Sequence, residues 1–111
     1  MSNQVPFACD MTALSSEQRS RHRELAKILQ ALLRGIRELS DGYEFEFPLH
    51  SETQDALTEI TPLERVCCPF FDVSIRLERE GGKLWWRLTG RAGVKPFIRA
   101  EFGPWFGGGS I

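Results

Sequence analysis

Apolar side chains recur at helical spacing from Leu25 onward. Ser15 can cap a helix, and Gln18 stands three residues later, which is the spacing of a capping box. The apolar positions that follow repeat every three or four residues: Leu25, Ile28, Leu29, Leu32, Leu33, Ile36 and Leu39. Gly42 then supplies a residue able to take a positive φ after the last turn. The pattern therefore predicts one amphipathic helix from residue 15 to residue 39 or 40.

A strand and a second helix follow in the same way. Residues 43–47 alternate apolar and acidic side chains, which predicts a strand with one buried face. Ser51 and Gln54 repeat the capping-box spacing, and apolar residues at helical steps predict a second helix through Cys67 or Cys68. Pro62 leaves open whether this helix is kinked or split. Pro69 forces Cys68 out of helical geometry and so fixes the end of the helix.

Two further alternating runs, residues 71–77 and 84–88, predict a hairpin joined at Gly81 and Gly82. A two-residue loop there pairs Leu77 with Trp86 and Ile75 with Leu88, so both apolar faces fall on one side. The same register sets Arg76 opposite Arg87, a like-charge pair that needs a carboxylate to share it. Residues 94–102 predict a short third helix that ends at Gly103 and Pro104.

These elements predict one α+β domain over residues 1–111. It is expected to be a two-layer sandwich, with a small antiparallel or mixed three-stranded sheet and three helices on one face. A right-handed crossover makes the first two strands parallel. The hairpin then returns the last strand antiparallel, and this strand can lie between the first two. Residues 1–14 are expected to form an extended packed segment, and residues 103–111 a partly flexible tail.

Composition narrows the classes of function. With 14 Lys and Arg against 15 Asp and Glu, the net charge is −1, which does not favour a nucleic-acid or acidic-membrane surface. The N-terminus lacks the pattern of a signal peptide, and no apolar run approaches membrane-spanning length. We therefore expect a cytoplasmic protein with no membrane partner, whose three cysteines are reduced.

The most unusual chemistry lies at Cys67 and Cys68, two adjacent thiols at the predicted helix end. Two sulfur donors suit a soft metal ion, such as zinc, copper(I), mercury or trivalent arsenic, or a thiol redox sensor. Glu64 lies one turn earlier and points to the same side, and Cys9 and His22 are candidates to complete the site. The C-terminal end of a helix disfavours a thiolate, so the alternative that the cysteines are only small core residues stays open.

The second candidate site is the sheet face away from the helices, where an exposed Trp85 is expected among charged side chains. The predicted interface residues are Trp85, Arg76, Arg87, Glu44 and Glu46. Tryptophan and arginine are enriched at interface centres, and a sheet with one helix-free side is often covered by a second copy. The alternative function is therefore a homodimeric protein-interaction module whose cysteines are only structural.

Three motifs together resemble those of a family of small uncharacterised bacterial proteins. They are Glu-Arg-x-Cys-Cys-Pro-Phe at residues 64–70, Leu-Thr-Gly-x-x-Gly-Val-Lys at residues 88–95, and Cys9-Asp10 before Arg-x-Arg-His at residues 19–22. The resemblance implies a bacterial, cytosolic origin and no particular activity. An enzyme is the less favoured class, because neither histidine, His22 or His50, belongs to a recognisable acid–base motif.

Overall fold

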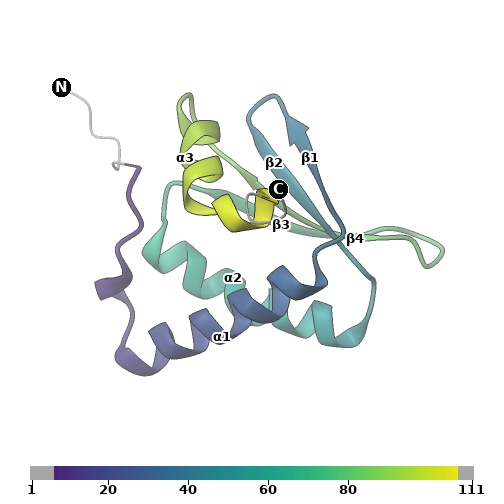
Figure 1. Ribbon diagram of the computed structural model, residues 1–111, viewed down its shortest axis with the longest axis horizontal. Helices are drawn as coiled ribbons and strands as arrows, with labels where there is room; N and C mark the ends of the chain where they lie inside the picture. The colour runs from purple at the N-terminus through teal and green to yellow at the C-terminus, as the bar shows by residue number, and fades with distance from the viewer. Residues whose placement is uncertain (1–6, 108–111) are drawn as a thin grey trace.

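The computed structural model describes residues 7–107, which form three α-helices and a four-stranded sheet (Figure 1). The helices are α1 (Ser16–Leu32), α2 (Ser51–Cys67) and α3 (Val94–Glu101), and the strands are β1 (Gly35–Leu39), β2 (Gly42–Phe47), β3 (Asp72–Leu77) and β4 (Leu84–Thr89). Short 3₁₀ helices, η1 (Met11–Ala13) and η2 (Gly103–Phe106), precede and follow them. The predicted α+β class is confirmed. The predicted strand number is wrong, because four strands pair antiparallel in the order β1-β2-β4-β3.

The first helix begins as predicted and ends early. Ser15 Oγ accepts a hydrogen bond from the Gln18 backbone N–H at 3.1 Å, and Gln18 Oε1 accepts one from the Ser15 N–H at 2.9 Å. The capping box is therefore present. The predicted end at residue 39 or 40 is wrong, because α1 stops at Leu32, Leu33 is its C-cap, and Ile36 and Leu39 belong to β1.

β1 takes the place of the predicted helix end because it completes a hairpin with β2. Ile36 lies opposite Phe45, and Leu39 lies opposite Gly42. Gly35 costs a helix about 1 kcal/mol relative to alanine, whereas the hairpin gives the backbone of β2 a second line of hydrogen-bonding partners. Gly42 does not stop a helix. A Cβ atom there would lie 2.0 Å from the Leu88 carbonyl oxygen, so the glycine allows β4 to approach β2.

α2 is a single helix that includes Pro62, so it is not split. The predicted capping box at Ser51 is wrong, because the N-cap is His50 and its side chain makes no capping hydrogen bond. Next to the proline, Thr61 Oγ1 donates to the Leu57 carbonyl oxygen at 2.7 Å and accepts from Trp86 Nε1 at 3.1 Å. The helix ends at Cys67, as Pro69 predicts.

The β3–β4 hairpin has the predicted faces but a different register. Leu77 pairs with Leu84, and Ile75 pairs with Trp86, two residues away from the predicted pairing. The turn is longer than two residues, because the Glu78 N–H donates to the Lys83 carbonyl oxygen at 2.9 Å and both Glu80 and Gly81 have positive φ. A shift of two residues keeps every side chain on its face, so the apolar face was predicted correctly, although Leu77 at the end of β3 is 47% exposed.

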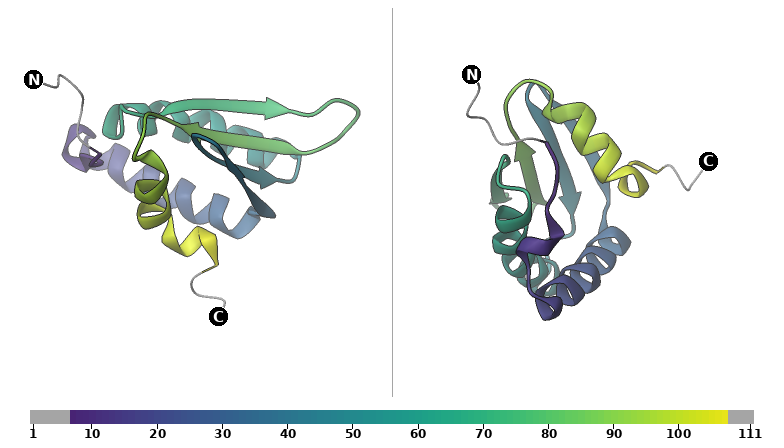
Figure 2. Two further views of the ribbon diagram at one scale, coloured as in Figure 1. Left: turned by 90° about the horizontal axis from the view of Figure 1, so that it is seen from above. Right: turned by 90° about the vertical axis from the view of Figure 1, so that its left-hand side faces the viewer.

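The core lies between the helices and the apolar face of β2 and β4. Phe45 and Trp86 are fully buried there, and both rings contact those of Phe102 and Trp105, with centroids 5.5 to 6.2 Å apart. Figure 2 shows α1 and α2 running together along the sheet, with the β3–β4 hairpin extending beyond them. β2 and β3 run in the same direction with β4 between them, as predicted.

The two ends of the described chain pack on this body. Phe7 contacts the rings of Phe70 and Phe97 at 5.3 Å and 6.1 Å, and Trp105 is buried in η2. The remainder of the predicted extended segment, residues 1–6, and of the predicted tail, residues 108–111, lies outside the described residues.

Candidate functional site

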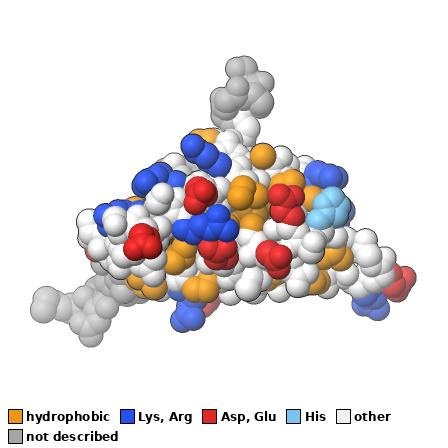
Figure 3. All heavy atoms as spheres, turned by 90° about the horizontal axis from the view of Figure 1, so that it is seen from below, with side chains coloured by type: hydrophobic (Ala, Val, Ile, Leu, Met, Phe, Trp, Pro, Cys, Tyr) orange, Lys and Arg blue, Asp and Glu red, His pale blue; other side chains and the backbone are white. Residues whose placement is uncertain are grey.

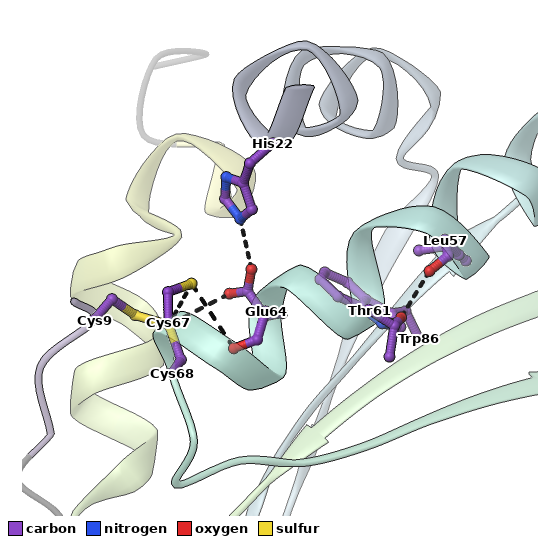
Figure 4. A network of polar contacts seen from close by, with 8 residues as sticks. All are labelled: Cys9, His22, Leu57, Thr61, Glu64, Cys67, Cys68 and Trp86. Atoms are coloured by element: carbon purple, nitrogen blue, oxygen red, sulfur yellow. Dashed lines mark hydrogen bonds and ion pairs between the residues drawn. A yellow bond between two sulfur atoms is a disulfide. The ribbon is translucent and has the colours of Figure 1, made fainter. Parts of the chain in front are cut away.

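The two adjacent cysteines lie where α2 ends, and a third cysteine meets them there. Cys68 is the C-cap of α2, and its N–H donates to the Glu64 carbonyl oxygen at 2.7 Å. Cys9 forms a disulfide with Cys68 across 59 residues of sequence (Figure 4). The expectation of three reduced cysteines is therefore wrong in this structure. Folding brings Cys9 close enough to Cys68 for the bond, which spacing along the chain does not reveal.

Residues 7–14, which we call the strap, carry Cys9 to the end of α2. The Asp10 N–H donates to the Cys67 carbonyl oxygen at 2.8 Å, one of the carbonyls that a helix end leaves without a partner inside the helix. Asp10 Oδ1 accepts from the Thr12 N–H at 3.0 Å and so caps η1. At the other end of the strap, Arg19 Nη1 donates to the Leu14 carbonyl oxygen at 2.7 Å. The strap is thus held on both sides of the disulfide.

Cys67 is the free thiol of the cluster. Its Sγ lies 3.6 Å from Cys68 Sγ and 3.8 Å from the Glu64 carbonyl oxygen. The residue is 1% exposed. Burial, together with the nearby Glu64 carboxylate, raises the pKa of the Cys67 thiol from 9.0 to about 12. The expectation that a helix C-terminus holds a poor nucleophile agrees with this direction, and Cys67 is a thiol at neutral pH.

Glu64 connects the sulfurs to α1. Its side chain is almost fully buried, and Oε2 lies 2.7 Å from His22 Nε2. The other oxygen, Oε1, lies 3.7 Å from Cys68 Sγ. Figure 4 shows the carboxylate between the imidazole and the sulfurs. All five predicted metal residues, Cys9, His22, Glu64, Cys67 and Cys68, therefore meet at one place, as two overlapping triplets whose possible ligand atoms lie within 4.8 Å of one another.

The predicted interface residues all lie on the face of the sheet opposite to Phe45 and Trp86, but Trp85 is not exposed. It is 4% accessible, because the guanidinium of Arg37 lies 4.2 Å from its ring centroid and Arg76 and Lys83 lie at 5.8 Å and 5.7 Å. The predicted pairing of Arg76 with Arg87 is wrong. Arg76 lies opposite Trp85, and Arg87 lies opposite Ser74.

Glu44 is the charged centre of that face. Arg37 and Arg87 both donate to its carboxylate, through Arg37 Nε at 2.8 Å and Arg87 Nε at 3.1 Å. Burial opposes ionisation of Glu44, but these hydrogen bonds and charges outweigh it and lower the pKa of the carboxyl. The sequence indicated Glu44 or Glu46 as the group that shares the arginines. It missed Arg37, which the predicted helix had placed away from the sheet.

On the side of the molecule formed by α1 and α2, acidic and basic side chains form pairs rather than a patch of a single charge. Arg21, at the basic start of α1, donates to Glu59 of α2 at 2.6 Å and 2.8 Å. Figure 3 shows acidic and basic side chains interspersed on this side of the molecule. Within residues 7–107, no helix is both long and apolar enough to cross a membrane.

Comparison with known proteins adds no relative. The sequence matches no protein family, and no curated protein or solved structure is significantly similar to it. The candidate function therefore depends on the geometry of the residues themselves.

Proposed function

We propose that this protein is a thiol redox sensor whose switch is the Cys9–Cys68 disulfide. One observation carries the proposal: the disulfide joins two segments that lie 59 residues apart in sequence. Two-electron reduction of the disulfide breaks the covalent bond between the strap and the end of α2, and oxidation forms it again. The position of Cys67 also gives the reduced cluster three sulfurs in one place.

The exchange chemistry starts at Cys9, because Cys9 is only partly buried whereas Cys67 and Cys68 are each 1% exposed. A small thiolate attacks Cys9 Sγ, the bond to Cys68 breaks, and Cys68 leaves with the electron pair and takes up a proton. A second small thiol then attacks the sulfur that the first one left on Cys9. The products are two protein thiols and one small disulfide, and oxidation is the reverse sequence.

The structural consequence of reduction falls on the strap. The disulfide closes a loop of 59 residues, and the chain-entropy model assigns such a closure about 4 kcal/mol of stabilisation. Once the bond is broken, the strap keeps only non-covalent contacts, such as the Asp10 hydrogen bond to Cys67 and the Phe7 ring against Phe70. The reduced protein is therefore expected to release the strap more readily than the oxidised one.

A cytoplasmic setting fits a sensor, because glutathione keeps thiols reduced there and a disulfide forms only when conditions become oxidising. The test is equilibration in glutathione buffers of graded potential, followed by acid quenching, alkylation and mass measurement. A reversible transition above about −300 mV supports a sensor, and one below that value indicates a purely structural bond. Cys9→Ser and Cys68→Ser must abolish the transition, whereas the matched variant Cys67→Ser must keep it.

The second candidate function is a homodimeric interaction module on the open sheet face. It is supported by the inferred two-layer arrangement, in which the helices cover one face and leave Arg76, Arg87 and Glu46 on the other. The cations over Trp85 weaken this candidate, because a partner would meet their outer sides rather than the ring. Light scattering over a range of concentrations tests it. A dimer that Trp85→Ala disrupts supports the module, and a monomer throughout contradicts it.

A further inference from the structure

We propose that reduction converts this cluster into a closed site for a zinc-sized divalent cation, held by Cys9, Cys67, Cys68 and Glu64. The inference rests on the proposed redox function, because Cys9 and Cys68 can act as ligands only when their disulfide is open. His22 is assigned a positioning role through the Glu64 carboxylate.

The spacing of the donor atoms on α2 carries the inference. Two thiolates bound to one tetrahedral zinc ion, each at about 2.3 Å, lie about 3.8 Å apart. Cys67 Sγ and Cys68 Sγ are already 3.6 Å apart. For a thiolate and a carboxylate oxygen on the same ion the corresponding distance is about 3.6 Å, and Cys68 Sγ lies 3.7 Å from Glu64 Oε1. Two of the separations that a shared ion requires, Cys67 Sγ to Cys68 Sγ and Cys68 Sγ to Glu64 Oε1, are therefore present before any ion enters.

The strap supplies the fourth donor. Cys9 Sγ belongs to the group of Cys9, Glu64 and Cys68 whose possible ligand atoms lie within 4.8 Å of one another. Once the disulfide is open, Cys9 Sγ can take the spacing of about 3.8 Å from Cys68 Sγ that a shared ion requires. Cys9 lies on the strap, outside the helices and strands, so this movement does not require Glu64 and Cys67 on α2, or Cys68 at its C-cap, to move. The ion would then hold the strap in the place of the disulfide.

His22 completes the environment of the site. Its Nε2 lies 2.7 Å from Glu64 Oε2, which leaves Oε1 facing the sulfurs. Metal-ligating carboxylates are usually held by a hydrogen bond from outside the ligand shell, and loss of that partner typically lowers metal affinity 10–100-fold. Four protein ligands in a buried place describe a structural or regulatory metal site rather than a catalytic one.

The experiment uses the full chain, reduced and then freed of reductant without oxygen. Zn²⁺ is titrated against a chromogenic chelator, and Co²⁺ serves as a spectroscopic probe of ligand geometry. We expect one equivalent of either ion per reduced chain, visible bands of tetrahedral thiolate-bound cobalt, and no such binding to the oxidised chain. Glu64→Gln and Cys67→Ser should each lower the affinity at least 10-fold, and His22→Asn should lower it 10–100-fold.

Matched variants on the same helix separate a site from general weakening. Glu52→Gln in the first turn of α2 and His50→Asn at its N-cap are exposed and should leave the affinity unchanged. Circular dichroism of each variant checks its folding, and Glu64→Gln keeps the side-chain shape if a cysteine variant does not fold. The inference is overturned if the reduced chain, with three alkylatable thiols, takes up neither ion, gives octahedral cobalt spectra, or binds equally well without Cys67. A disulfide that cannot be reduced reversibly would instead refute the proposed redox function.

Discussion

Two buried glutamates in this protein have chemically different partners. Glu44 is 1% exposed and receives hydrogen bonds from two arginines, whereas Glu64 is 3% exposed and faces one histidine and the sulfurs. Both positions make an isolated carboxylate costly. At Glu44 the free-energy cost of burying the carboxylate is offset by the guanidinium groups of Arg37 and Arg87, which balance its charge.

The surroundings of Glu64 are different, because its neighbours can change their chemical state. The cysteines can exchange a disulfide for thiols. A carboxylate held by arginines forms a structural ion network, whereas the carboxylate among sulfur and imidazole is the one on which the proposed redox and metal functions depend. The comparison yields three predictions.

The largest effect is expected at the sulfur end, where one covalent bond closes a long loop. Cys68→Ser should lower the free energy of unfolding by about 4 kcal/mol in oxidising buffer, measured by guanidinium denaturation. In reducing buffer the wild type should lose the same stability and fall close to the variant. Cys67→Ser serves as the control, since it keeps the bond and should remain sensitive to reductant. If the free energy of unfolding of the wild type did not change with reductant, the disulfide would not stabilise the fold as predicted.

The second effect concerns the reactivity of Cys67. A pKa of about 12 in place of 9.0 lowers the thiolate fraction at neutral pH about a thousandfold, so iodoacetamide should modify Cys67 more slowly by about that factor in the native than in the unfolded protein. Mass spectrometry of timed samples measures the ratio. Cys9 in the Cys68→Ser variant provides the reactive control.

The raised pKa of Cys67 also sets the sign of an alkaline effect. The folded protein keeps the proton to higher pH than the unfolded chain does, so this contribution to stability is complete below about pH 9 and is lost as the pH rises toward 12. Cys67→Ala should therefore lose less stability than the wild type over this interval. Rapid native alkylation, or equal alkaline sensitivity of the two proteins, would contradict the burial argument.

The third and smallest effect lies at Glu44. Glu44→Gln should cost about 2 kcal/mol, because two arginines lose a charged acceptor at a buried position, although their own side chains are half exposed. Glu46→Gln is the matched control on the same strand, since its side chain is partly exposed and lies 3.6 Å from Lys83. The control should change stability by less than about 1 kcal/mol.

The pH dependence of that difference sharpens the prediction. The pKa of Glu44 is lower in the folded protein than its ordinary 4.5, so its contribution is present above about pH 4.5 and is lost as the pH falls through the folded value. The stability gap between the wild type and Glu44→Gln should narrow below about pH 4.5. A gap that stays constant down to pH 2 would show that the loss comes from packing rather than from the carboxylate charge.

The sequence predicts the helix cap, the helix stop and the strand alternation because each depends only on residues close together in the chain. The capping box at Ser15, the stop at Pro69 and the alternation of β2 each depend on residues within one or two turns or along one strand. Glu64 was placed beside the cysteine pair for the same reason, since residues three and four apart share a helix face. The choice of face in the β3–β4 hairpin survived a wrong register, because a shift of two residues preserves it.

Only the tertiary structure decided which distant segments meet. Residues 35–39 continue a helical spacing in sequence, yet they form β1 because β2 offers them a line of backbone partners. Trp85 alternates to the open face as expected, yet cations from β1 and β3 cover it. Cys9 reaches Cys68, and His22 reaches Glu64, through the packing of the strap and α1 against α2. Periodicity records which way a side chain points from its own element, and it holds no information on which element will lie opposite.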